Sequence, residues 1–119
     1  MKKIILALTA ALMVFSLSSC GKEKKNQSGK VWIVATDTVF RPFEYTNEKN
    51  EFVGIDVDIL AAIAEDQGFK YDLQSLGWDA GVAAVQVGQA DALIAGATIK
   101  QSRIDSGWIF SEGYYNATQ

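Results

Sequence analysis

The segment from Gly54 to Gly68 is the feature that most limits what this chain can fold into. Its apolar residues recur at helical spacing, and they are Ile59, Leu60, Ile63 and Ala64. Gly68 stands where a helix commonly ends in the left-handed conformation. The segment therefore predicts a helix over Gly54–Gln67 with one apolar face.

Two acidic residues, Asp56 and Asp58, fall in the first turn of this predicted helix. Negative charge is favourable there, because it complements the positive end of the helix dipole. A catalytic pair of carboxyls needs one raised pKa, and no neighbouring residue in the sequence argues for one. We interpret both aspartates as scaffold residues outside any ligand site.

Strand and helix patterns alternate along the rest of the chain. Strands are expected over residues 31–35, 69–73, 92–95 and 108–110, and a hairpin over 43–53 around the polar turn 46–50. A helix capped by Asp79 carries Val82 and Val85 on one face, and residues 100–105 form one or two helical turns. This alternation predicts an α/β fold with a mainly parallel sheet flanked by helices.

The composition excludes several classes of protein. The chain has 119 residues, of which 49% are hydrophobic and 21% charged, so it is globular rather than disordered. Its net charge of −3 argues against nucleic acid as a partner. With no histidine and one cysteine, the chain cannot form an internal disulfide or a multi-cysteine metal site, and no cofactor is expected.

The first thirty residues are expected to lie outside the folded part. Residues 1–19 combine Lys2 and Lys3 with a short apolar run, which is typical of a secretory signal. The run ends in Leu-Ser-Ser before Cys20, which resembles a lipobox and implies cleavage before Cys20 and a lipid on its sulfur. An ordinary signal peptide or an uncleaved anchor is the alternative. Residues 20–30 then form the lipidated cysteine and a polar, flexible tether.

Three loops follow the predicted parallel strands at their carboxyl ends, where such sheets bind ligands. The sharpest is 96–103, which leaves a strand and enters a helical turn. Gly96 allows close backbone approach, Thr98 offers a hydroxyl, and Arg103 offers a planar fork that suits a carboxylate. The alternative makes Thr98 a helix cap and Arg103 a surface residue paired with Asp105 or Glu112.

The other two loops add an acid and two aromatic rings. Asp37 can accept hydrogen bonds from a ligand amide or amine, and Phe40 and Trp78 can enclose an aliphatic stem. Ala95 and Gly96 are expected to offer backbone carbonyls to an amine. The alternative makes Asp37 a turn cap, Phe40 a core residue and Trp78 a plug at the helix entry; Phe43 is expected in the core.

The segment GIDVDILAAIAEDQ at Gly54–Gln67 resembles the signature of the bacterial family 3 solute-binding proteins, the polar amino-acid receptors of ABC importers. Gly96, Thr98 and Arg103 match the family's carboxylate motif residue by residue. Residues 35–45, ATDTVFRPFEY, are similar to the glutamine-binding members, in which the matching aspartate and phenylalanine contact the ligand. Trp78 matches a common aromatic position. Gln67 and the segment after Arg103 depart from the usual pattern.

The resemblance implies that residues 31–119 are the N-terminal lobe of a type II periplasmic-binding-protein fold, truncated at the hinge, with the second lobe missing. It implies an extracytoplasmic receptor, anchored by lipid to the membrane and monomeric when complete. Such a receptor holds a polar amino acid, glutamine as the first guess, between two lobes for the importer's membrane subunits. A single lobe covers one face of a ligand, so we expect this chain to bind amino acids weakly or not at all.

Two rival functions share this fold. One is a periplasmic dehydratase acting on carboxylated ring substrates, but no nucleophile–base pair or metal cluster stands out in the sequence. The other is the sensor lobe of a receptor or kinase. We expect a binding protein and not an enzyme.

Overall fold

The computed structural model describes residues 29–117. The signal, lipidation and most of the tether predicted for residues 1–28 lie outside the described residues. Within the described part, three parallel strands form one sheet in the order β5-β1-β6, with bounds Lys70–Ser75, Val31–Thr36 and Ala92–Leu93. Three short strands form a second, antiparallel sheet in the order β2-β3-β4, with bounds Val39–Phe40, Glu44–Thr46 and Phe52–Val53.

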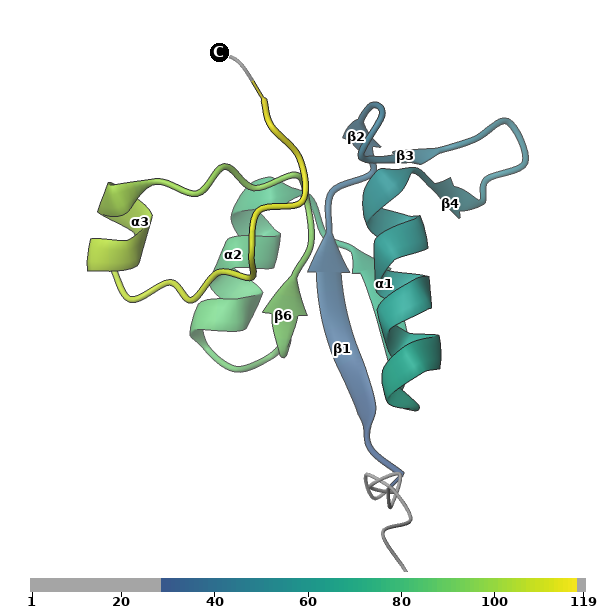
Figure 1. Ribbon diagram of the computed structural model, residues 1–119. Coiled ribbons are helices and arrows are strands. Elements are labelled where there is room, and N and C mark those ends of the chain that lie inside the picture. Colours follow the sequence, from purple (N-terminus) through teal and green to yellow (C-terminus); the bar gives the residue numbers. More distant parts are fainter. Residues whose placement is uncertain (1–28, 118–119) are drawn as a thin grey trace, which may run out of the picture.

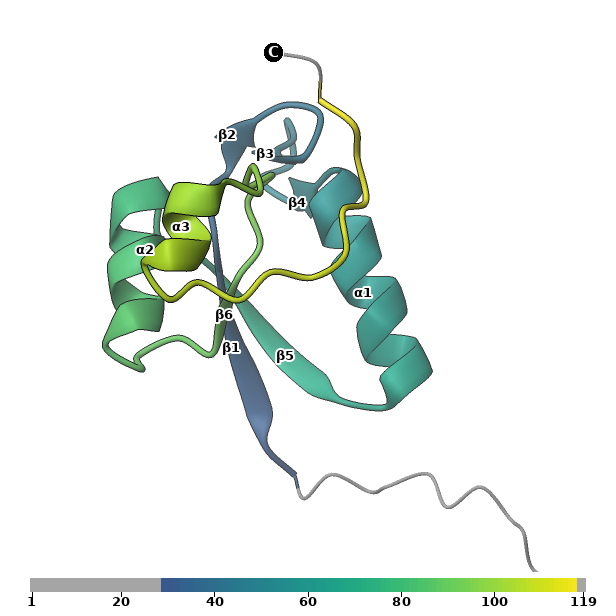
Figure 2. The ribbon, with the colours of Figure 1, turned by 60° about the vertical axis from the view of Figure 1, so that its left-hand side comes forward.

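The parallel sheet is covered by a helix on each face, as Figures 1 and 2 show. Successive residues of a strand point to opposite faces, and β1 follows this rule. Ala35 packs with Ala84 of helix α2 (Trp78–Gln86), and Ile33 lies beside it. Trp32 and Val34 face the other way, toward helix α1 (Ile55–Gln67). The predicted α/β fold with a mainly parallel sheet is therefore confirmed.

Helix α1 has the extent that its sequence predicts. It buries Asp56, Leu60 and Ala64 at intervals of four residues, and Gly68 closes it in the left-handed region with φ 70°. The Gly68 amide donates to the Ala64 carbonyl at 2.9 Å, which satisfies a carbonyl at the helix end. Periodicity and a terminal glycine were enough to locate this element.

Helix α2 begins differently from the prediction. Gly77, with φ 78°, precedes the helix, and no side chain caps its first turn. Asp79 is therefore wrong as the capping residue. It lies one residue inside the helix, where its charge still favours the positive end of the helix dipole.

The chain after helix α3 (Gln101–Asp105) also departs from the prediction. Residues 108–110 form no strand, because the Trp108 amide bonds to the Arg103 carbonyl at 3.0 Å and closes the helix instead of joining a sheet. The Trp108 ring stacks on Phe110, with centroids 5.8 Å apart. The segment then crosses in front of the sheet toward the chain end, as Figure 2 shows.

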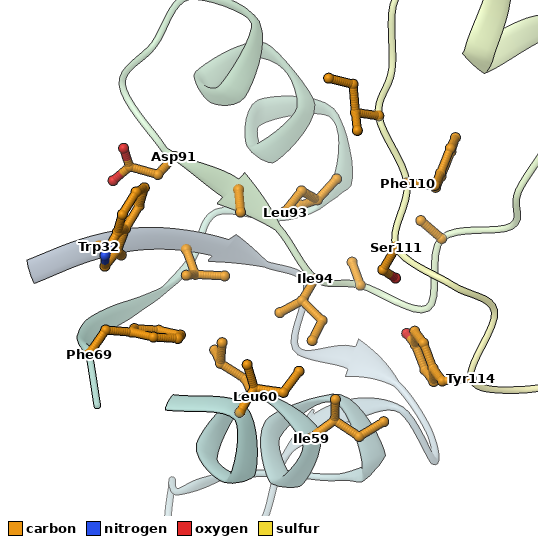
Figure 3. Close-up of a pocket in the computed structure, with 16 residues that line it drawn as sticks. Trp32, Ile59, Leu60, Phe69, Asp91, Leu93, Ile94, Phe110, Ser111 and Tyr114 are labelled. Carbon is orange, nitrogen blue, oxygen red and sulfur yellow. The ribbon is translucent and has the colours of Figure 1, made fainter. Parts of the chain in front are cut away.

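An apolar hollow of about 300 Å³ separates helix α1 from the parallel sheet. Figure 3 shows Leu60 and Ile59 of the helix facing Trp32, Phe69 and Ile94, with Tyr114 at one end. No helix among the described residues is long and apolar enough to cross a membrane. The buried apolar core is small, and large apolar side chains such as Ile63 and Ile109 are exposed.

Candidate functional site

The seven residues that the sequence predicts for a ligand site line one pocket of about 240 Å³. The seven are Asp37, Phe40, Trp78, Ala95, Gly96, Thr98 and Arg103. Two residues that the sequence analysis did not predict, Glu44 and Ala97, also line the pocket. The pocket lies past the carboxyl ends of the parallel strands, the position that α/β sheets use for ligands. Their contact with a ligand stays a prediction.

Backbone hydrogen bonds bring the three loops together. The amides of Leu76 and Gly77 donate to the Thr36 carbonyl at 3.0 and 3.3 Å, which holds the entry to α2 against the end of β1. The Ile94 amide donates to the Ala35 carbonyl at 3.0 Å, which extends the pairing of β6 with β1 toward the pocket. The central position of β1 therefore assembles the pocket from segments far apart in sequence.

Arg103 of α3 is held in place by three groups. Its Nη1 donates to the Thr98 carbonyl oxygen at 2.7 Å. Its guanidinium lies 4.8 Å from the ring centre of Trp78 and 5.2 Å from that of Trp108. A guanidinium has five N–H donors, so this arrangement orients the group while leaving donors for a carboxylate.

Arg103 does not pair with an acidic side chain. Within residues 29–117 the only salt bridge joins Lys30 to Asp91, at 2.6 Å. Arg103 therefore forms no salt bridge with Asp105 or Glu112, its alternative partners. Asp105 instead accepts a hydrogen bond from the Gln101 side chain at 2.9 Å. A guanidinium without a counter-ion at a pocket is well suited to bind an anionic group.

Each of the two aromatic residues that line the pocket packs against another aromatic ring. Phe40 stacks on the buried Phe43, with centroids 5.1 Å apart, and its ring lies against Gly96. A Cβ on Gly96 would come within 2.9 Å of that ring, and φ there is +53°. Trp78 packs near Trp108, with centroids 6.1 Å apart. Sequence reasoning missed Trp108, because it lies in a segment that was expected to be a strand.

Asp37 is the acidic residue that the sequence predicts for this pocket. Its Oδ1 accepts from the Thr38 amide at 2.7 Å, and none of the described residues donates to Oδ2. The residue is half-buried and lines the same pocket as Arg103. The pocket therefore carries an acidic and a basic group, which can meet a hydrogen-bond donor and an anionic group of one ligand. No group of three or more acidic, histidine or cysteine side chains suited to a metal ion occurs in the described part of the chain.

Glu44 is the pocket residue for which the sequence held no signal. Only 1% of it is exposed, and neither carboxyl oxygen receives a hydrogen bond from the described residues. Burial is the largest cause that raises its pKa, from the ordinary 4.5 to about 8. The charge of Asp56, and the hydrogen bond that a protonated Glu44 can donate to Asp56, add to the rise. Glu44 is therefore predominantly protonated at neutral pH.

The sequence analysis explained Asp56 by its place at the helix end alone, and the structure corrects this because Asp56 also bonds to other segments. The residue is fully buried. Its Oδ2 accepts from the Gly96 amide at 2.6 Å, and its Oδ1 accepts from the Tyr114 hydroxyl at 2.8 Å. Asp56 thus holds the backbone of a pocket residue, whereas Asp58 is exposed.

The chain matches known proteins over its folded part. The sequence model described as "Bacterial extracellular solute-binding proteins, family 3" covers residues 32–119. A relative from Neisseria gonorrhoeae, named "Probable histidine-binding protein", is 36% identical over 125 residues, which span all of this chain and 46% of the relative. The chain thus spans about half the length of such curated relatives.

Solved structures of similar proteins share the fold. The second substrate-binding domain of GlnP from Lactococcus lactis is 42% identical, with a TM-score of 0.63 over 66% of this chain and 34% of that one. Domain 1 of TmArgBP, in an arginine-bound form, is 28% identical, with a TM-score of 0.59 over 63% of this chain and 60% of that one.

The share of each relative that is covered and the structural likeness agree with one lobe of a type II periplasmic binding protein. The structural likeness extends to relatives that are more than 25% identical, so it reflects common descent as well as architecture. The chain belongs to the bacterial extracellular solute-binding proteins of family 3, and it corresponds to their N-terminal lobe.

Proposed function

We propose that this chain is the N-terminal lobe of a receptor that binds a polar amino acid for an ABC importer. The observation that carries the proposal is the meeting of Arg103, Thr98 and Asp37 around one pocket. Arg103 and Thr98 hold the α-carboxylate, and Asp37 accepts hydrogen bonds from the distal end of the ligand. A second lobe closes over the ligand and presents the closed form to the membrane subunits.

The ligand that we favour carries a basic side chain. Oδ2 of Asp37 is an acceptor, and a guanidinium or imidazolium satisfies a carboxylate with a charge-assisted hydrogen bond. Relatives named for histidine and arginine support this choice over glutamine, the first guess from the sequence. Glutamine remains the competitor, because an amide can also donate to Asp37.

The remaining parts of the proposal concern location. Residues 1–19 direct export, Cys20 carries a lipid, and residues 21–30 tether the lobe outside the membrane. The family's description as extracellular supports export. The complete receptor is a monomer that releases its ligand unchanged.

Calorimetric and NMR titration of the chain with arginine, histidine and glutamine tests the ligand. Weak binding is expected, and arginine should bind more tightly than glutamine. Arg103→Ala should remove binding of all three, and Asp37→Asn should reduce the preference for arginine. Asp58→Asn, an equal change of charge on the exposed side of α1, is the control.

Three results would contradict the proposal. They are binding that survives Arg103→Ala, an equal loss with Asp58→Asn, and conversion of a ligand to a product during incubation. A preference for glutamine that is unaffected by Asp37→Asn would overturn the choice of ligand alone.

A further inference from the structure

Two acidic side chains lie beneath the proposed ligand pocket, and ligand binding as proposed above uses neither of them. Glu44 is 1% exposed and Asp56 is fully buried. Buried carboxyls are costly unless each is paired or neutralised.

The backbone forces the two side chains together. The Asp56 amide donates to the carbonyl of Phe43 at 2.9 Å, and Glu44 is the next residue in the chain. The Ile55 amide likewise donates to the Pro42 carbonyl at 3.1 Å. Helix α1 thus begins directly against the start of β3, so that Asp56 and Glu44 are both buried and the charge of Asp56 acts on Glu44.

This close approach depends on Gly54. A Cβ at that position would lie 2.3 Å from the Phe43 carbonyl oxygen, and φ there is +129°. The short contact and the positive φ each exclude any residue with a Cβ at position 54, so only glycine fits there. The glycine that opens the helix therefore also sets the contact between the two acids.

Asp56 has two donors, whereas Glu44 has none. Asp56 accepts from the Gly96 amide and the Tyr114 hydroxyl, which is how a buried carboxylate is stabilised. Glu44, as a carboxylate, would face the charge of Asp56 without a partner among the described residues. A proton on Glu44 removes this conflict, because the protonated carboxyl can donate to Asp56.

The ionisable groups around Glu44 support the same assignment. They are Asp37 after β1, Arg41 before β3, Asp56 on α1, Arg103 on α3 and Tyr114 near the chain end. The cation of Arg41 stacks on Tyr45, 3.9 Å from its ring centre, and that of Arg103 on two tryptophan rings. The charges of the acids Asp56 and Asp37 both favour the protonated form of Glu44.

We propose that Glu44 is a positioning residue of the pocket: its protonated carboxyl donates to Asp56 and thereby holds the Gly96 amide in place. Loss of this proton puts two negative charges side by side in a buried position. The pair then separates, and Asp56 loosens its hold on Gly96 and on Tyr114. The pocket floor is ordered at neutral pH and becomes disordered in alkaline solution.

NMR of the isotopically labelled chain without ligand tests this proposal. The amide resonance of Gly96 and its protection from hydrogen exchange are followed from pH 6 to pH 10. In the wild-type chain both should change together with a midpoint near pH 8. Protection should fall about tenfold or more, as expected for the loss of a hydrogen bond to a charged group.

Glu44→Gln is the decisive variant, because its amide donates to Asp56 at every pH. Its Gly96 amide should stay protected throughout the range. Glu48→Gln, in the exposed turn of the same hairpin, should behave like the wild type. A wild-type chain without the transition, or Glu44→Gln with an unchanged transition, would overturn the proposal.

A second variant keeps the test open if Glu44→Gln does not fold. Tyr114→Phe removes one donor from Asp56, so the doubly ionised pair is less well stabilised and the midpoint should move to higher pH. An unmoved midpoint would contradict the proposal. All these measurements are made without ligand, so a failure of the proposed amino-acid binding would be seen separately in the titrations with arginine.

Discussion

Replacing Glu44 by glutamine is expected to remove a pH dependence from the stability of this lobe. Glutamine keeps the volume of the side chain and a donor toward Asp56, but it does not titrate. The pKa of Glu44 is higher in the folded chain, at about 8, than its ordinary value of 4.5. The folded state therefore holds this proton more tightly than the unfolded state.

This difference in pKa determines how the stability of the lobe changes with pH. The stabilisation is fully present below about pH 4.5, and it is lost as the pH rises to about 8. The slope is about 1.4 kcal/mol per pH unit, so the free energy of unfolding should fall by at most about 5 kcal/mol across this range. Because only 1% of Glu44 is exposed, solvent screening should reduce this total little, whereas reorganisation around the ionised side chain would lower it.

Urea denaturation at intervals from pH 5 to pH 9, followed by tryptophan fluorescence, measures the effect. The free energy of unfolding of the wild type should decrease relative to that of Glu44→Gln between pH 5 and pH 8, and the difference should level off above pH 8. Glu48→Gln should follow the wild type. Parallel curves for the wild type and Glu44→Gln would refute the reasoning, because they would mean that Glu44 titrates normally.

Three further changes test other parts of the molecule. Trp108→Leu removes one of the two rings on the Arg103 guanidinium and should weaken amino-acid binding about two- to fivefold in calorimetry. Gly54→Ala puts a Cβ 2.3 Å from the Phe43 carbonyl oxygen at φ +129°, and it should cost more than about 2 kcal/mol in urea denaturation. Cys20→Ser should move the protein from the membrane fraction to the soluble fraction of cells, because each buried lipid CH₂ contributes about 0.8 kcal/mol of membrane affinity.

Matched controls separate these effects from general damage. Trp32→Leu alters a tryptophan that lines the apolar hollow beside α1 and not the ligand pocket, so it should leave amino-acid affinity unchanged. Gly29→Ala adds a methyl group where no atom lies within 4 Å, and it should leave stability unchanged. Equal effects of control and test variants would contradict the first two predictions, and membrane association that persists in Cys20→Ser would contradict the third.

Local patterns predicted much of the fold. The apolar period of α1 and the glycine after it determine a helix wherever that face can be buried, so its bounds were predictable. Alternating strands and helices likewise imply a parallel sheet, which places Asp37, Trp78 and Arg103 past the carboxyl ends of strands. Their convergence on one pocket was therefore predictable, although contact with a ligand is still a prediction.

Other features depended on contacts between distant segments. Glu44 lies between Phe43 and Tyr45 in a hairpin. This alternation of apolar and acidic residues does not show whether the acid is solvated or buried. It is buried because α1 begins against β3, and Asp56 acquires its role for the same reason. Trp108 contacts Arg103 because a hydrogen bond closing α3 replaces the expected strand.

The sequence by itself thus determined the class of fold, the family signature and most of the residues gathered at the pocket, since these depend on short periods and spacings. Only the tertiary structure decided which acids are buried and which groups hold Arg103 and Gly96. Burial, desolvation and hydrogen-bond pairing arise between residues far apart in the chain, such as Asp56 and Tyr114, which are 58 positions apart. Those interactions have no signal in a local pattern of residues.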